Sequence, residues 1–131
     1  MIFVDTVAWC AVLIPSDPYH LQVAQFLKTA KPDVLTTDYV IDETLTFLRG
    51  RQLFGTAVEM GRRFFDLNQV RIEYIGAKDI RRAWELFRSQ PQRAWSFTDC
   101  TSKVVIERFH IKQALTFDQD FREFGNLTLV P

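Results

Sequence analysis

The chain has 131 residues, a length that suits one domain and leaves little room for a second. Hydrophobic residues make up 47% and charged residues 24% of it, the balance of an ordinary globular protein with a buried core. Sixteen lysines and arginines match sixteen aspartates and glutamates, so the net charge is zero and excludes a global basic field of the kind that attracts nucleic acid. A local basic face stays open, because several arginines occur in pairs.

The cysteines and the apolar segments indicate the cellular compartment of the protein. Cys10 and Cys100 lack the spacing of a zinc site, and two isolated cysteines indicate free thiols in a reducing environment. Residues 7–14 are apolar but too few to span a bilayer, and no basic segment precedes them as it would in a signal peptide. The sequence therefore predicts a cytoplasmic protein without membrane association.

Strands and helices are predicted to alternate from the first residues onward. Residues 2–4 form an apolar strand that runs directly into Asp5, as buried parallel strands do. An apolar helix follows at 7–14, and a proline start predicts a second helix at 18–30. The next predicted elements are a strand at 34–37, a helix at 38–52 and a helix at 56–68.

The second half of the chain continues this alternation. Residues 70–75 alternate with period two and predict an exposed strand at a sheet edge. The helix at 77–90 carries Ile80, Trp84 and Phe87 along one apolar stripe. The remaining predicted elements are a helix at 99–109 capped by Thr98, a strand at 113–117, one or two helical turns at 118–124 and a strand at 127–130. Five strands separated by helices predict an α/β fold with a mostly parallel sheet covered by helices on both faces.

Two adjacent carboxylates in the helix at 38–52 have different predicted surroundings. Asp42 belongs to a polar stripe and is predicted to be solvated. Glu43 has Val40 and Phe47 as its helical neighbours at i−3 and i+4, so it lies at a core boundary or faces a cleft. Glu43 is therefore the candidate site residue of the two.

Four acidic residues occupy similar places near the ends of predicted strands or the starts of helices. Asp5 and Asp118 each follow an apolar strand, Asp99 lies in a first helical turn, and Glu43 points from the helix after the second strand. The carboxyl ends of strands in an open α/β sheet are where chemistry collects. Taken singly, Asp99 and Asp118 are explained as well by helix capping, and Asp5 or Thr6 could also cap the first helix.

As a set, the four carboxylates favour a metal site. Carboxylates held close together repel one another and raise one another's pKa, and a divalent cation supplies the compensating charge. Oxygen ligation without histidine or cysteine suits Mg²⁺ or Mn²⁺ rather than Zn²⁺. Such ions activate a bound water and offset charge on a leaving oxygen, so the pattern indicates phosphate chemistry.

The carboxylates lie in four short segments: IFVDT at 2–6, TDYVIDET at 37–44, SFTDC at 96–100 and LTFDQDF at 115–121. Each segment alone is a weak signal. Their order, with successive carboxylates 38, 56 and 19 residues apart, is fairly specific. Over nearly its whole length the chain resembles PIN-domain ribonucleases, and more closely the VapC-type toxins of bacterial and archaeal toxin–antitoxin pairs.

The resemblance implies a single PIN-like domain over residues 1–131, built as a three-layer α/β/α sandwich with a mostly parallel five-stranded sheet. It implies an acidic site whose members are catalytic residues and ligands of Mg²⁺ or Mn²⁺: Asp5, Glu43, Asp99 and Asp118. By the same analogy Asp5 and Asp99 are the most direct ligands, and Thr6 and Thr98 are their polar supports.

Three further residues leave alternatives open. Asp120 lies two residues past Asp118 and turns away if that segment is helical, so Asp118, which ends the strand, is preferred. Trp95, in the loop before Asp99, is most simply a core or interface residue but is also a candidate for stacking on a base. Lys103 lies one turn after Asp99 and is a candidate for neutralising the acidic cluster or contacting a phosphate.

The function implied by the resemblance is a metal-dependent endoribonuclease that leaves 5′-phosphate and 3′-hydroxyl ends on tRNA or ribosomal RNA. A cognate antitoxin that covers the site and a homodimer are implied as well. One rival is a catalytically silent RNA- or protein-binding module on the same fold. Another is a different Mg²⁺-dependent phosphate-processing α/β enzyme, such as a phosphatase using Asp5 as nucleophile, although such enzymes usually need an acid at the position of Val7.

Overall fold

The computed structural model describes residues 1–131 and contains one five-stranded sheet in the order β3–β2–β1–β4–β5. The strands are short: β1 (Ile2–Val4), β2 (Val34–Thr37), β3 (Arg71–Glu73), β4 (Gln113–Leu115) and β5 (Thr128–Val130). All four neighbouring pairs run parallel. The predicted five-stranded parallel sheet is therefore confirmed, and the strand predicted at an edge is the edge strand β3.

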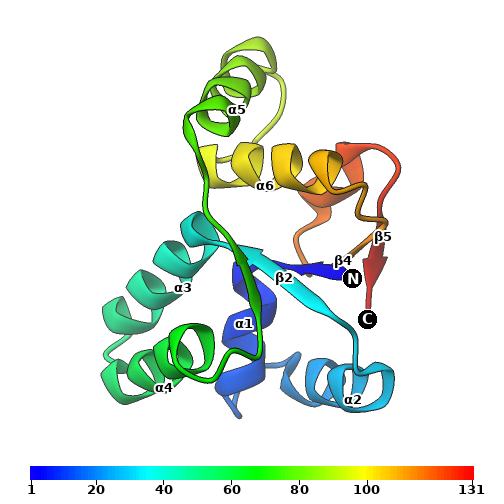
Figure 1. Cartoon of the computed structure of the whole chain (residues 1–131). Coiled ribbons are helices and arrows are strands. Elements are labelled where there is room, and N and C mark those ends of the chain that lie inside the picture. Colours follow the sequence, from blue (N-terminus) through cyan, green and yellow to red (C-terminus); the bar gives the residue numbers. More distant parts are fainter.

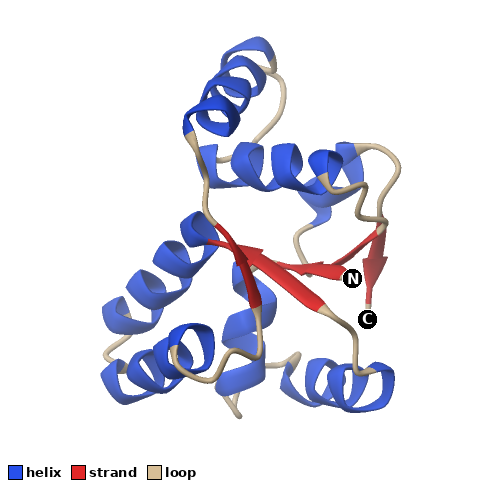
Figure 2. Cartoon of the chain, viewed as in Figure 1, coloured by secondary structure: helices blue, strands red, loops and turns tan.

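Helices cover both faces of this sheet (Figures 1 and 2). The helical elements are α1 (Thr6–Leu13), α2 (His20–Ala30), α3 (Asp38–Gly50), α4 (Phe54–Phe65), α5 (Ala77–Ser89), α6 (Phe97–Arg108) and the 3₁₀ helix η1 (Gln119–Phe124). In Figure 1, α5 and α6 lie above the sheet, whereas α1, α2 and α4 lie below it. The three-layer α/β/α arrangement is thus confirmed. No helix is both long and apolar enough to cross a membrane.

The central strand β1 explains why the chain begins with an uninterrupted apolar run. Phe3 and Val4 are completely buried, with Leu35 of β2 and Leu115 of β4 beside them in the sheet. Both faces of a parallel strand inside an α/β/α sandwich meet helices, so neither face calls for polar residues. Because β1 is held on all sides, the residue that follows it is placed rigidly.

The chain changes direction across the sheet at β1. Strands β2 and β3 are added on one side of it, and the chain then crosses over to add β4 and β5 on the other. Helices that leave neighbouring strands in opposite directions open a crevice at the carboxyl ends of those strands, and ligands of open α/β sheets bind there. Asp5, the first residue after β1, lies at this switch point.

The structure corrects the predicted starts of some helices. Helix α2 begins at His20 rather than at Pro18, and residues 119–124 form a 3₁₀ helix. Thr98 does not cap α6, because Ser96 is its N-cap residue. A serine followed three residues later by an acid is a capping-box pattern, and it decided the start of this helix.

Candidate active site

A cavity of about 430 Å³ opens beside Asp5 at the carboxyl end of β1. All four carboxylates predicted from the sequence line it, together with a fifth, Asp17, which the sequence reasoning missed. Its full lining is Asp5, Thr6, Val7, Cys10, Asp17, Glu43, Phe47, Ser96, Asp99 and Asp118. No lysine, arginine or histidine belongs to this lining, so the cavity is strongly acidic.

Asp5 is the most deeply buried carboxylate of the cavity, with 4% of its surface exposed. Its backbone N–H donates to the Leu115 carbonyl (3.2 Å), and Thr116 Oγ1 donates to Asp5 Oδ2 (3.2 Å). Burial, followed by the charges of Asp99 and Glu43, raises the pKa of Asp5 to about 7, although hydrogen bonds from the Thr6 backbone and the Thr116 side chain act in the opposite direction. Its side chain makes no capping hydrogen bond to α1, so the capping explanation does not apply to it.

Glu43 reaches the cavity from α3 and is held by the first residue of α1. Thr6 Oγ1 donates to Glu43 Oε1 at 2.7 Å, so the threonine hydroxyl orients the carboxylate instead of capping its own helix. Asp42 does not line the cavity; it is exposed, and its Oδ1 accepts a long hydrogen bond (3.5 Å) from Thr46. The structure therefore places the two neighbouring acids on different faces, as the helical spacing predicted.

Asp99 and Asp118 both cap helices and both line the cavity. Asp99 Oδ2 accepts the Ser96 N–H at 3.0 Å within the capping box of α6. Asp118 Oδ1 accepts the Asp120 N–H at 2.9 Å at the start of η1. Each carboxylate keeps a second oxygen for another partner. Burial, followed by the charges of Asp118 and Glu43, raises the pKa of Asp99 to about 6 despite the Ser96 hydrogen bonds.

Asp120 does not turn away from the cluster as expected. Carboxylate oxygens of Asp99, Asp118 and Asp120 lie within 4.8 Å of one another. The reason is that Asp118 is an N-cap residue in extended conformation, and its side chain folds over the first turn to accept the Asp120 N–H. Asp118 lines the cavity that holds Asp5, whereas Asp120 does not.

Several supporting residues differ from those expected. Trp95 is 8% exposed and packs edge-on against Phe124, so it offers no face for a base. Lys103 pairs with Glu107 and also donates to the Phe124 carbonyl (3.3 Å), which directs it away from the acidic cluster. Thr98 lies outside the lining.

Ser96 and Thr116 supply the polar support that was expected from Thr98. Ser96 is detectable from its spacing to Asp99, which is the capping-box spacing. Thr116 had no signal in the sequence, because its contact with Asp5 joins residues 111 positions apart.

The donor set of the cavity fits a hard divalent cation. The side chains that converge are carboxylates and hydroxyls, which suit Mg²⁺ or Mn²⁺. Burial first, and the charges of neighbouring carboxylates second, raise the pKa values of Asp5 and Asp99, and no lysine, arginine or histidine of the cavity lining offsets those charges. Cys10 also lines the cavity, but burial and the neighbouring carboxylates raise its pKa to about 11, so it stays a neutral thiol and a poor ligand.

Comparison with known proteins identifies the family. A family model described as the PIN domain matches residues 2–127. The chain belongs to the PIN-domain family. The 23S rRNA-specific endonuclease VapC20 of Mycobacterium tuberculosis is 33% identical over 131 residues, which cover 100% of this chain and 99% of that protein. The crystal structure of VapC20, a sarcin–ricin loop cleaving toxin, matches over the whole of both chains with a TM-score of 0.90 and 32% identity.

Two further proteins extend the comparison at lower identity. The VapC ribonuclease of Archaeoglobus fulgidus is 29% identical over 89 residues, 67% of this chain and 55% of that protein. VapBC2 of Rickettsia felis, solved with a DNA fragment from its promoter, shares the fold with a TM-score of 0.68 and 16% identity, over 98% of this chain and 97% of that one. The predicted VapC-type PIN ribonuclease family is thereby confirmed, and the phosphatase alternative is dropped. PIN nucleases depend on metal, in keeping with the acidic cavity.

Proposed function

We propose that this chain is a metal-dependent endoribonuclease and the toxin of a toxin–antitoxin pair, with large ribosomal RNA as its first candidate substrate and tRNA as the second. The observation that carries the proposal is the convergence of Asp5, Glu43, Asp99 and Asp118 on one cavity at the switch point of a PIN fold. Ribosomal RNA is placed first because VapC20, similar over the full chain, is a 23S rRNA-specific endonuclease.

In this proposal Asp5, Glu43, Asp99 and Asp118 hold one or two Mg²⁺ or Mn²⁺ ions. When bound, a divalent cation supplies a water of lowered pKa and offsets the negative charge that develops at the phosphate. Thr116 and Thr6 keep the Asp5 and Glu43 carboxylates in fixed orientations through their hydroxyl hydrogen bonds. No histidine lines the cavity, and Thr6 occupies only Oε1 of Glu43, so Glu43 Oε2 would be available to accept the proton of the attacking water.

Cleavage of purified ribosomes and of tRNA tests this function. With Mg²⁺ or Mn²⁺ we expect discrete cuts that leave 5′-phosphate and 3′-hydroxyl ends, mapped by primer extension and by phosphate-dependent adapter ligation. Glu43→Gln and Asp118→Asn should lower the rate at least about 100-fold, because each removes a charge that faces the cavity. Asp42→Asn, next to Glu43 but outside the cavity, is the matched control and should stay within about tenfold of wild type. A protein that binds RNA but leaves every phosphodiester intact would instead be the silent module.

A homodimer is the second part of the proposal, and exposed aromatic residues support it. The predicted apolar stripe of α5 is largely exposed: only Asp79 and Ala83 of this helix are buried, and Trp84 and Phe87 are 46% and 45% exposed. Their rings stack at 6.2 Å, and ring contacts continue from Phe87 through Phe97 of α6 to Tyr39 of α3. Such an unbroken aromatic surface is typical of an interface between protein chains.

Sedimentation equilibrium at micromolar concentration tests the dimer. The wild-type protein should sediment as a dimer and Trp84→Lys as a monomer, because a lysine charge inside an apolar interface loses its solvation. A monomeric wild type would contradict this part of the proposal.

We also propose a cognate antitoxin that covers the acidic cavity, because a toxin–antitoxin pair requires one. Co-purification of a protein encoded beside this chain tests this part of the proposal.

A further inference from the structure

Helix α3 carries three different side chains in one row: Glu43, Phe47 and Arg51. They are spaced at i, i+4 and i+8, so they follow one another along a single face. The helix ends at Gly50, but the Arg51 N–H still donates to the Phe47 carbonyl (3.1 Å), so Arg51 remains in the helical register. At 1.5 Å per residue the row is about 12 Å long and leads from the acidic cavity outward.

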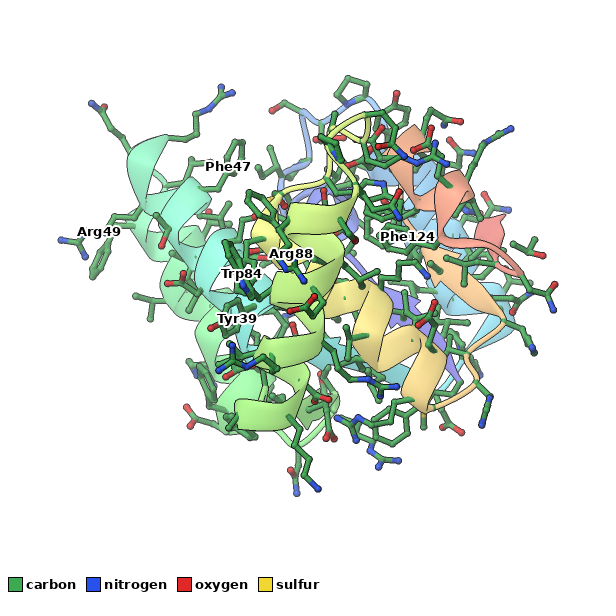
Figure 3. All side chains as sticks on the ribbon, turned by 90° about the horizontal axis from the view of Figure 1, so that it is seen from above. Tyr39, Phe47, Arg49, Trp84, Arg88 and Phe124 are labelled. Carbon is green, nitrogen blue, oxygen red and sulfur yellow. The ribbon has the colours of Figure 1, made fainter.

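Phe47 is the one aromatic residue that lines the acidic cavity. Its side chain is 41% exposed, although the other large residues on the inner side of α3, Val40, Ile41 and Leu48, are buried. In Figure 3, Phe47 and Arg49 leave α3 in different directions, and of the two only Phe47 lines the cavity. An exposed ring above a set of carboxylates contributes little to core packing. Its position suits a ligand that presents a flat apolar face.

Arg51 places a cation beside Phe47, at the end of the row farthest from Glu43. Its guanidinium carbon lies 5.0 Å from the centroid of the Phe47 ring. Five other arginines pair with carboxylates: Arg62, Arg63, Arg88, Arg93 and Arg108. Arg51 makes no such pair, so its charge is free for an external anion. The cavity itself contains five carboxylates and no cation, and an RNA strand that enters it needs a positive group beyond the metal site.

We propose that Phe47 and Arg51 position the RNA strand on α3. A base beside the cleaved phosphodiester stacks on the Phe47 ring, and a phosphate farther along the strand pairs with the Arg51 guanidinium. This inference rests on the proposed ribonuclease function and adds to it the residues that hold the substrate. Base–aromatic stacking and guanidinium–phosphate pairing are the two contacts that hold single-stranded RNA, and the row offers one of each next to the carboxylate Glu43.

Binding of a fluorescently labelled RNA stem-loop tests the two positions. Measured by anisotropy in an Asp5→Asn background with Mg²⁺ present, Phe47→Ala and Phe47→Leu should weaken binding roughly 5- to 100-fold. Phe47→Trp should retain binding because tryptophan keeps a flat ring. Arg51→Gln should weaken binding and make its dependence on log salt concentration shallower by roughly 0.7. Arg49→Gln is the matched control, since Arg49 is also unpaired but lies over Phe54, and it should bind as the parent does.

Steady-state cleavage separates positioning from a structural effect. In the catalytically intact chain, Phe47→Leu and Arg51→Gln should raise KM and change kcat less than about threefold, because these residues hold the strand but do not touch the reacting atoms. The inference is overturned if both variants keep the wild-type KM, if Arg49→Gln weakens RNA binding as much as Arg51→Gln, or if the variants lose only an inhibitory protein partner. Failure of the wild type to cleave any RNA would instead refute the proposed function.

Discussion

Replacing Asp5 by asparagine is expected to abolish RNA cleavage, by about 10³-fold or more, while making the metal-free protein more stable. The loss of activity follows from the position of Asp5, which is 4% exposed at the end of β1 and faces Asp99 and Glu43 across the cavity. Asparagine has nearly the same shape and can still accept the Thr116 hydrogen bond through its amide oxygen. It lacks only the negative charge, so the substitution isolates that charge.

The gain in stability follows from the raised pKa of Asp5. Burial raises this pKa from 3.8 to about 7, so between these values the folded protein binds more protons than the unfolded chain does. The free energy of unfolding therefore falls as the pH rises through this range. Above pH 7 the buried carboxylate is ionised, and its ionisation lowers the free energy of unfolding by up to about 4 kcal/mol. Asparagine does not ionise, so it does not lower the free energy of unfolding in this way.

Thermal unfolding in EDTA measures this effect. At pH 8, Asp5→Asn should unfold at a higher temperature than wild type, and at pH 4 to 5 the difference should shrink because wild-type Asp5 is then protonated. Saturating Mn²⁺ should stabilise the wild type more than the variant, because a ligand stabilises the state that binds it. A variant that is less stable at every pH, or that cleaves RNA at the wild-type rate, would rule out a central role for the Asp5 charge.

Withdrawal of the metal is expected to stop cleavage completely, and the affinity for metal should rise steeply with pH. Asp5 and Asp99, with pKa values of about 7 and about 6 in the metal-free protein, must lose their protons before they bind a cation. Below pH 6 the logarithm of the binding constant should therefore increase with pH with a slope approaching two. Between pH 6 and 7 the slope should fall towards one, and above pH 7 the affinity should level off.

Isothermal titration of the chain with Mn²⁺ between pH 5 and 8.5 checks these slopes. Repeating it in buffers of different ionisation enthalpy counts the released protons directly. Asp5→Asn should lose the part of the pH dependence that lies nearest pH 7, and Asp42→Asn should behave as the wild type. Cleavage that persists in EDTA, or an affinity that does not change between pH 5 and 7, would contradict oxygen ligation by these two carboxylates.

Much of the fold could be predicted because its signals are local in the sequence. An uninterrupted apolar run marks β1, period-two alternation marks the edge strand β3, and helical spacing separates Glu43 from Asp42. Such patterns depend on the residues that lie within one or two turns along the chain, and the amino-acid sequence alone sets which residues these are. Exact helix starts were less predictable. Ser96, and not Thr98, is the N-cap of α6, because nearby hydroxyl residues compete for the same capping position.

For the candidate site, the sequence by itself determined which carboxylates follow strands and helix starts, and therefore that Asp5, Glu43, Asp99 and Asp118 were the residues to consider. Only the tertiary structure decided what else shares their cavity. The Thr116 hydroxyl, after β4, contacts Asp5, after the neighbouring strand β1. Asp17 joins the cavity from the α1–α2 connection, and Phe47 and Arg51 extend the site along α3. These contacts arise where separate elements pack together, and their distances depend on how strands and helices are arranged in space, which no short stretch of sequence encodes.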